Sequence, residues 1–539
     1  MTALLAPEAP AAPAARSGRR TIHLAPRPSR RRPGLVQRVP ARWRSPLVLL
    51  ALMALSATLS TLLLLRQSLR LDEAQSLWQT SHSFGRMYEI VAQDVHVPLY
   101  HTVLRTWVLL VGNGVAATRV LSLVLFLLTI PAVYALGRRV LSERASLFAA
   151  GLVAVSPFMT WYGSEVRMYS MLTLIAVLNQ LYFLRLLQRA GGPNWSLYAL
   201  TALLGTYTHY FFWFTLLTQA VFFLGNRRAF PRGTFVRLAA VGVGLVAGLS
   251  PWLLFVRGQG GSEANRPLLP EPTSVDLFNT FSQFLFGFQD DRINTLLVAM
   301  WPFAVLLALL AVQKAKRVPL EVGYLLLMGL FPILAAFVVS IALRPVYVNR
   351  YLIVSLPALL LFLTWLCTVY GRRMSRLLRV ALPVALLAAS LHQATASTTP
   401  TKEDYRAVSR YLETAASPQD VVVISPPFTS YPFQYYWEGS AAVTTLPAWN
   451  RFESGDAPAF DPAVLPAQAD ALAVSHRTAW LVLSYDQGYE ETIVKYFDAN
   501  FERKQVRTPS PGLMVVEYRM RYDQPDTTQL LGYLNTQTG

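Results

Sequence analysis

Residues 46–65 read PLVLLALMALSATLSTLLLL, and residues 69–78, just beyond them, read LRLDEAQSLW. The first stretch carries no charge and is long enough to cross the ~30 Å hydrocarbon layer of a membrane as one helix. The second stretch places two adjacent acids, Asp72 and Glu73, directly after that crossing. Because a carboxylate is costly near hydrocarbon, the position of this pair at the boundary of lipid and water needs an explanation.

The composition of the whole chain indicates a membrane protein. Of its 539 residues, 53% are hydrophobic and 14% are charged, whereas a soluble protein carries about 25% charged residues. The net charge is +18, but the basic residues form short clusters between apolar runs, which is typical of cytoplasmic loops. We therefore expect the lipid bilayer as a partner and no nucleic acid. The one cysteine, Cys367, allows no intrachain disulfide.

The first 45 residues are rich in alanine, proline and arginine. They lack the aliphatic side chains that would bury a core, so we predict a disordered basic tail over residues 1–45 on the cytoplasmic side. A cleaved signal peptide is the alternative. However, the apolar run at 46–65 is longer than a typical signal core, and no small-residue cleavage site follows it. We expect this run to be retained as the first span.

The apolar runs and the basic clusters together predict eleven membrane spans. The runs are 46–65, 117–137, 145–163, 168–184, 195–209, 210–225, 236–256, 293–312, 320–342, 351–370 and 378–395. With eleven crossings, all the basic clusters fall on the side of the N-terminal tail; they are Arg138/Arg139/Arg144, Arg185/Arg189, Arg227/Arg228/Arg232, Lys314/Lys316/Arg317 and Arg372/Arg373/Arg376. This predicts a multi-pass protein of the plasma (inner) membrane, with its N-terminus cytoplasmic and its C-terminal region extracytoplasmic.

One further apolar segment, 98–112, is not counted as a span. It is short and carries Arg105, and a crossing here would move all the later basic clusters to the other side. We interpret it as an amphipathic helix in the membrane interface. Residues 66–112 then form one long outer loop with two half-buried helices. Farther along, two adjacent spans leave room only for a tight turn at THYF, residues 208–211.

From about residue 398 the composition becomes that of a soluble domain. The expected elements are a helix over 402–416 with Tyr405, Val408 and Leu412 on one stripe, buried strands over 420–427 and 478–486, and a helix over 491–501. The fold class is therefore a polytopic α-helical membrane protein with a small α/β domain. We predict a transmembrane catalytic domain over 46–397 and an extracytoplasmic α/β domain over 398–539.

Polar residues gather at the outer ends of the predicted spans. A transporter or channel keeps ionisable groups at mid-depth beside its pathway, so this distribution favours a site at the membrane surface. Besides Asp72 and Glu73, the candidate substrate-binding residues are Asp94, His96, Tyr100, His101, Glu165, Arg167, Tyr169, His209, Tyr210, Arg344, Arg350 and Tyr351.

Acids, arginines and aromatic rings at the lipid boundary suit one chemistry. A partly desolvated carboxylate can deprotonate an incoming hydroxyl. Arginines can hold a phosphate through two hydrogen bonds and stabilise it as it leaves. This combination indicates sugar transfer from a lipid-linked phosphate donor to a hydroxyl, with the lipid tail lying between helices.

Five motifs occur in order along the chain: DEAQS (72–76), DVHVPLYH (94–101), SEVRMYS (164–170), THYF (208–211) and NRYLIVSLP (349–357). Together they resemble the bacterial membrane glycosyltransferases of the GT-C fold. The similarity is greatest to the dolichyl-phosphate-mannose–protein mannosyltransferase-like group, which includes the aminoarabinose transferases of lipid A. The resemblance covers roughly residues 46–370.

The resemblance implies roles for individual residues. The acid of the first outer loop in this fold is the catalytic base, which falls on Asp72, and Glu73 matches the second acid, which would orient the acceptor or the base. Arg350 would bind the donor phosphate, with Arg167 as a second candidate. Relatives often have His-Pro-Pro where this chain has His96-Val97-Pro98, and this departure puts the role of His96 in doubt. The family uses polyprenyl-phosphate sugars and inverts the anomeric carbon in a single displacement.

Structural alternatives stay open for these residues. Asp72 and Glu73 also suit the N-terminus of the helix that follows them, and Arg167 also suits an ion pair with Glu165 or contact with lipid headgroups. The tyrosines also suit an interfacial aromatic belt. His96, His101 and His209 cap helix ends or join Asp94 as ligands of a divalent metal, and their spacing does not decide between the two.

Two other functions also remain open. A related ligase or polymerase would use a diphosphate-linked donor and would need more cationic charge, whereas a transporter or flippase would move lipid or solute without a covalent product. The sequence identifies neither the donor sugar nor the acceptor, for which a glycan, a lipid and a protein all remain candidates.

Overall fold

The structure of the protein is a computed structural model. It describes residues 41–94, 96–188, 192–259, 269–299, 301–315, 317–396, 403–451, 457–485 and 487–520. Of the predicted basic tail, residues 1–40 lie outside the described residues.

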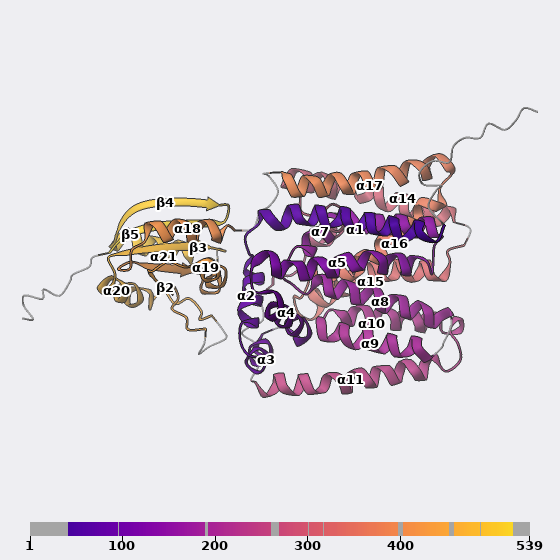
Figure 1. The fold of residues 1–539 in the computed structure, drawn as a ribbon, viewed down its shortest axis with the longest axis horizontal. Helices are drawn as coiled ribbons and strands as arrows, with labels where there is room; N and C mark the ends of the chain where they lie inside the picture. Colours follow the sequence, from indigo (N-terminus) through magenta and orange to yellow (C-terminus); the bar gives the residue numbers. More distant parts are fainter. Residues whose placement is uncertain are drawn as a thin grey trace, which may run out of the picture. The chain divides into compact units, whose positions relative to one another are not determined.

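Apolar helices that run side by side make up most of the chain up to residue 395 (Figure 1). Every predicted span coincides with one helix or with a helix pair divided by a short break. These helices are α1 (Ala41–Arg66), α5 (Val115–Gly137), α6 (Glu143–Ala154), α7 (Pro157–Gly163), α8 (Tyr169–Gln188), α9 (Gly192–Thr208), α10 (Phe212–Gly225), α11 (Thr234–Gly258), α13 (Asp291–Ala299), α14 (Trp301–Lys314), α15 (Leu320–Ala342), the 3₁₀ helix η4 (Asn349–Ser355) with α16 (Leu356–Val369), and α17 (Arg372–Thr395). The predicted polytopic helical fold is therefore confirmed.

Seven helical segments of the described residues are long and apolar enough to cross a membrane alone. The pair α6 and α7, bent by 58°, would give an eighth crossing. The bend occurs where Pro157 opens α7, because a residue that precedes proline is disfavoured in the α conformation. The remaining predicted spans fall on the shorter helices α9, α10, α13 and α14, so the number of eleven stays a prediction.

Hydrogen bonds between the ends of neighbouring helices identify the two ends of this bundle. At one end, Arg139 Nη1 donates to Gln188 Oε1 at 3.5 Å, and Gln188 Nε2 donates to the Arg139 carbonyl at 3.3 Å. At the other end, Arg66 Nη1, at the end of α1, donates to the Ala394 carbonyl at 3.0 Å. The first two basic clusters therefore share one end, as their charges predict. Which end faces the cytoplasm stays a prediction.

The first outer loop contains three helices where we expected two. They are α2 (Leu71–Thr80), α3 (Phe84–Gln93) and α4 (Pro98–Val111), and Figure 1 shows all three at the same end of the bundle. The extra division occurs because Ser83 caps a new helix, its hydroxyl accepting from Arg86 N. At about 1.5 Å per residue, the 14 residues of α4 are too short to cross the bilayer upright. Arg105 of α4 donates to the Thr80 carbonyl at 2.8 Å.

The connections of the bundle contain one more helix, α12 (Ser274–Phe286), and the 3₁₀ turn η2 (Arg227–Ala229). Thr273 and Asp276 begin α12, because the Asp276 carboxylate accepts from the Thr273 backbone N–H at 2.8 Å. The predicted tight turn at THYF is confirmed, since α9 ends at Thr208 and α10 begins at Phe212.

The C-terminal domain is a five-stranded mixed sheet with helices. Its elements are α18 (Tyr405–Ala415), β1 (Val421–Ser425), η5 (Pro427–Thr429), α19 (Ser430–Tyr436), β2 (Ala442–Thr445), α20 (Leu465–Ser475), β3 (Thr478–Ser484), α21 (Glu490–Asn500), β4 (Glu502–Ser510) and β5 (Leu513–Arg519). The strand order is β2-β1-β3-β5-β4. β1 is parallel to β2 and β3, and β5 is antiparallel to β3 and β4. The two predicted helices and two predicted strands are confirmed.

Both faces of this sheet are covered. Val421 and Val423 of β1 pack on one face with α20 and α21, whereas Val422 and Ile424 pack on the other with α18. A strand that is buried on both sides reads as a continuous apolar run, and VVVI is such a run. The predicted stripe of α18 is buried against the second face and consists of Tyr405, Val408 and Leu412.

Candidate active site

The face of α2 that carries Asp72 is the centre of the candidate site. Asp72, Gln75, Ser76 and Gln79 are three or four residues apart, so they share one side of the helix. The carboxylate of Asp72 lies 3.4 Å from the guanidinium of Arg350. Arg350 belongs to the 3₁₀ helix η4, which directly precedes α16. Both side chains are about one quarter exposed, so this ion pair is open to an incoming group.

Three arginines surround the Asp72 carboxylate. Burial by itself would raise the pKa of Asp72, but Arg167, Arg350 and Arg70 outweigh it and lower that pKa to about 2. Asp72 is therefore ionised at any physiological pH.

Arg167 is fixed against α2 by its own hydrogen bonds. Its Nη1 donates to the Asp72 carbonyl at 3.2 Å and to Ser76 Oγ at 3.0 Å. Its Nη2 lies 3.2 Å from His96 Nε2, and because arginine can only donate, this ring nitrogen accepts. Arg167 as a whole is 3% exposed, so the alternative role of contacting lipid headgroups is not supported.

His96 is neutral in this environment. Burial lowers the pKa of His96 to about 3, and the nearby Arg167 acts in the same direction. Burial also lowers the pKa of His101 to about 3, and the two rings lie 5.6 Å apart. These histidines therefore act as uncharged acceptors or packing groups, not as cations.

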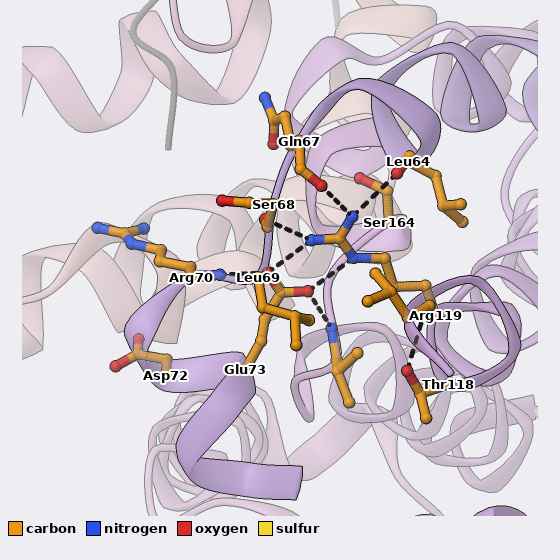
Figure 2. A network of polar contacts seen from close by, with 12 residues as sticks. Leu64, Gln67, Ser68, Leu69, Arg70, Asp72, Glu73, Thr118, Arg119 and Ser164 are labelled. Atoms are coloured by element: carbon orange, nitrogen blue, oxygen red, sulfur yellow. Dashed lines mark hydrogen bonds and ion pairs between the residues drawn. The ribbon is translucent and has the colours of Figure 1, made fainter. Parts of the chain in front are cut away.

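Glu73 points away from Asp72 and into the bundle, as Figure 2 shows. Its carboxylate pairs with Arg119 through Nε and Nη2, both at 2.9 Å, and both side chains are buried. The same carboxylate accepts from Arg70 N at 3.0 Å and from Val166 N at 3.0 Å. Of the two acids that suit the start of α2, Glu73 therefore caps the helix and Asp72 does not.

Arg119 also connects the end of α1 to the Glu73 carboxylate. Its guanidinium donates to the carbonyls of Leu64, Gln67 and Ser68, each at 2.9 Å (Figure 2). A buried ion pair is tolerated only when its remaining hydrogen-bonding groups are satisfied, and here they hold the turn that precedes Asp72. Arg119 is absent from the residues predicted from sequence, although an arginine just inside an apolar span is a signal that could have identified it.

Aromatic rings line the Arg350 side of the site. Tyr351 lies 6.3 Å from Tyr169 in a stacked arrangement and 4.7 Å from the ring of His209. Arg350 stands over the Tyr351 ring at 5.5 Å. The tight turn between α9 and α10 positions His209, whose Nδ1 accepts from Phe211 N at 3.1 Å.

Asp94 extends the site along α2. Its Oδ2 accepts from Gln79 Nε2 at 2.8 Å and from Gln75 Nε2 at 3.2 Å, and it lies 3.8 Å from His96 Nε2. Sequence reasoning missed both glutamines, although their spacing from Asp72 along one helix face marks them.

Not every predicted residue reaches the cluster. Tyr210 instead packs beside α11, where Trp252 Nε1 donates to its hydroxyl at 3.4 Å. Arg344 is exposed beyond the end of α15. Tyr100 is buried in α4 and stands edge-on to His101 at 5.7 Å. Glu165 is buried and acts electrostatically on Arg70, and its pair with Arg167 stays a prediction.

Arg70 is a further site residue that sequence reasoning missed. It immediately precedes α2, and its charged neighbours include Glu165, Asp72 and Tyr485. Burial opposes its charge, but these groups outweigh burial and raise the pKa of Arg70.

A metal ion does not fit the histidine cluster. Among the described residues, no three His, Cys, Asp or Glu side chains gather closely enough to hold one. His96 Nε2 is already engaged by Arg167, and Asp94 is engaged by two glutamines. The donor set therefore serves hydrogen bonding.

A largely apolar cavity of about 480 Å³ lies beside α4. Its lining includes Pro98 and Leu99, which follow His96 closely in sequence, together with Tyr207 and Trp252 from α9 and α11. Its lining residues also include Tyr88, Thr102, Pro251 and Phe255. The cavity therefore offers apolar surface next to a charged site.

Comparison with known proteins supports a fold assignment. Residues 95–255 match the family model described as dolichyl-phosphate-mannose-protein mannosyltransferase. No curated protein matches the chain in sequence.

Two solved structures of ArnT from Cupriavidus metallidurans are similar over nearly their whole length. The apo form has a TM-score of 0.59 at 12% identity, covering 89% of this chain and 98% of ArnT. The form bound to undecaprenyl phosphate has a TM-score of 0.59 at 14% identity, covering 88% and 98%. An oligosaccharyltransferase from Archaeoglobus fulgidus matches more distantly, with a TM-score of 0.46 at 13% identity, covering 86% of this chain and 72% of that protein.

The chain thus has the ArnT-like GT-C fold of a multi-pass membrane protein, and the resemblance inferred from its motifs is confirmed. The family model matches residues 95–255, and the solved structures show the fold.

Proposed function

We propose that this protein transfers a sugar from a polyprenyl-phosphate donor to a hydroxyl acceptor at the outer face of the membrane, with Asp72 as general base. The observation that carries the proposal is the ion pair between Asp72 and Arg350 at 3.4 Å, with Arg70 and Arg167 beside it. This ion pair places a proton acceptor, Asp72, beside a guanidinium that can bind a phosphate.

The charges at the site match such a donor. Glu73 and Arg119 neutralise each other inside the bundle, which leaves three arginines facing Asp72 and Glu165. A sugar phosphodiester carries one negative charge, which these guanidiniums can hold. As the glycosidic bond breaks, the lipid phosphate gains a second negative charge, which these guanidiniums stabilise.

The reaction proceeds in one displacement. The acceptor oxygen forms a bond to the anomeric carbon from the face opposite the phosphate, and its proton passes to Asp72. The bond between the anomeric carbon and the phosphate oxygen breaks, and its electron pair stays on the lipid phosphate. The configuration at the anomeric carbon is inverted, and no oxidant or reductant is consumed.

Arg350 links donor binding to the strength of the base. A phosphate that engages Arg350 competes with Asp72 for the same guanidinium. Its negative charge also offsets the arginines that hold the pKa of Asp72 low. Asp72 therefore becomes more basic when the donor is bound, which is when a base is needed.

The other residues support this arrangement. Glu73 acts as a positioning residue, because it fixes the first turn of α2 and touches no open surface. Neutral His96 orients Arg167 by accepting one of its N–H groups. The stacked rings of Tyr169 and Tyr351 would line the sugar pocket.

The apolar cavity of about 480 Å³ beside Pro98 and Leu99 suits the isoprenoid tail of the donor. The ArnT structure in complex with undecaprenyl phosphate supports a lipid phosphate as the ligand of this fold. The outward orientation of the site is supported by the first two basic clusters, which share the far end of the bundle. The acceptor is a glycan, a lipid or a protein hydroxyl.

Reconstituted wild-type protein, given sugars linked to undecaprenyl phosphate, tests the proposal. We expect a glycosylated product and free undecaprenyl phosphate in equal amounts, detected by mass spectrometry. Turnover only with diphosphate-linked donors would indicate a ligase or polymerase. Movement of lipid between leaflets without a covalent product would indicate a transporter, and either result would contradict the proposal.

A further inference from the structure

The linker Gln67–Arg70, which joins α1 to α2, is held from two sides. From the bundle, the Arg119 guanidinium donates hydrogen bonds to the carbonyls of Gln67 and Ser68. From the C-terminal domain, the Tyr436 hydroxyl accepts from Leu69 N at 2.8 Å. Ser68 Oγ donates to the Glu403 carbonyl at 2.5 Å. The turn that presents Asp72 therefore depends on both parts of the chain.

Glu403 in turn holds a tyrosine of unusual backbone conformation. The Tyr485 hydroxyl donates to Glu403 Oε2 at 2.9 Å. Tyr485 directly follows β3 and has a φ of 53°, and it is the one non-glycine residue with positive φ among those that the structure describes. This conformation costs a bulky residue on the order of 1–3 kcal/mol and persists only where the surroundings enforce it, often at functional sites.

Tyr485 and Arg70 are electrostatic neighbours. Apart from burial, Glu403 and Arg70 are the charged groups that act on the Tyr485 phenol. Arg70 is in turn influenced by Asp72. The Arg70 guanidinium therefore interacts electrostatically with both the Tyr485 phenol and the Asp72 carboxylate.

We propose that Tyr485, with Glu403, is a positioning residue that keeps Arg70 available to the anion site, so that the C-terminal domain completes the active site. The inference rests on the proposed function, because it concerns the binding of the lipid phosphate.

The physical reason lies in competition for Glu403. Its carboxylate is occupied by the Tyr485 hydroxyl. Without the hydroxyl, Glu403 can pair with Arg70 directly. That pair would withdraw one guanidinium from the phosphate, because the carboxylates of Asp72, Glu165 and Glu403 would then share it with the ligand.

Undecaprenyl phosphate alone is the probe for the test, in full-length protein in lipid nanodiscs. Its Kd is measured for wild type, Tyr485→Phe, Arg70→Gln and the double variant. We expect Tyr485→Phe to weaken binding about 5- to 10-fold, the loss of roughly one hydrogen bond. In the Arg70→Gln background the same change should have no further effect, because contacting residues are not additive.

Tyr435→Phe is the matched control. The Tyr435 hydroxyl donates to the Asn113 carbonyl at 2.7 Å, so this variant also loses a hydrogen bond from α19 to the bundle, but not one at the linker. Its Kd should stay within about twofold of wild type. Glu403→Ala/Tyr485→Phe is a second route: its Kd should equal that of Glu403→Ala, because the carboxylate that the lost hydroxyl would release is then absent.

The outcomes separate the two proposals. Binding by wild type with a non-additive pair supports the inference. Binding by wild type with additive effects of Tyr485→Phe and Arg70→Gln, or with Tyr485→Phe equal to the control, overturns the inference alone. No binding by wild type overturns both this inference and the proposed function.

Discussion

Asp72 Oδ2 and Arg350 Nη2 lie 3.4 Å apart, although the two residues come from opposite ends of the helical part of the chain. The pair joins the first turn of α2 to the 3₁₀ turn before α16. It brings a carboxylate into contact with a guanidinium at the end of the bundle where the interfacial helices gather.

The role of Arg350 in donor binding can be tested by substitution. Arg350→Ala should raise the Kd for undecaprenyl phosphate by about 10- to 100-fold, because a hydrogen bond to a charged group contributes about 1.5–3 kcal/mol. Acceptor affinity should change much less. Arg344→Ala is the matched control, since Arg344 is exposed beyond α15, and it should bind like wild type. Equal losses of donor and acceptor affinity would assign Arg350 a different role.

The buried pair Glu73–Arg119 should matter mainly for stability. Glu73→Ala leaves the Arg119 guanidinium buried without its carboxylate, which costs about 3–5 kcal/mol. Thermal unfolding in detergent should show a lower midpoint for this variant than for Glu89→Ala, a change on exposed α3. The double variant Glu73→Leu/Arg119→Met should recover part of the loss. A wild-type midpoint for Glu73→Ala would contradict the network of Figure 2.

The pH profile should report the charges around Asp72. Burial alone would raise its pKa, but Arg167, Arg350 and Arg70 lower it to about 2. The base is therefore ionised throughout the range above about pH 4, and kcat/KM should show no acid limb from Asp72 there. Arg167→Gln removes one of these charges, so the pKa of Asp72 should rise and the acid limb of the kcat/KM profile should move to higher pH. An unchanged acid limb would mean that Arg167 does not control this carboxylate.

The turn that positions His209 depends on a glycine. A Cβ at Gly205 would overlap the ring of Phe212, which is fully buried and has little room to move. Gly205→Ala should therefore destabilise the protein by about 1–3 kcal/mol. Gly244→Ala on α11 meets nothing within 4 Å, and it should be neutral or stabilising by up to about 1 kcal/mol. Equal thermal midpoints for the two variants would contradict this packing.

Much of the fold follows from the apolar runs alone. The lengths of the apolar runs and the positions of the charges predicted the long helices. The fully apolar run VVVI predicted a strand whose side chains are buried on both faces of the sheet. The edge strands were not predicted, because residues such as those of β4 are mostly exposed and carry no apolar pattern. The third helix of the first outer loop depends on a single serine cap, which is a weak signal in sequence.

Site residues that belong to a sequence motif were predictable, whereas the direction in which a side chain points was not. The clustering of Asp72, Arg167 and Arg350 agrees with the motifs. Glu73 is adjacent to Asp72 in sequence, but successive helical residues point about 100° apart, so it faces the bundle instead. Arg344 and Tyr210 lie near their motifs in sequence, yet the end of α15 and the turn before α10 direct them elsewhere.

The most direct test of Asp72 as the base compares turnover and donor binding in Asp72→Asn. Removing the carboxylate frees Arg350 for the phosphate, so undecaprenyl phosphate should bind at least as tightly as in wild type. Loss of the base should lower kcat by about 10²–10⁴-fold. Glu89→Gln, which changes an exposed acid of α3, should retain both properties. Turnover at the wild-type rate in Asp72→Asn would contradict the assignment of Asp72 as the catalytic base.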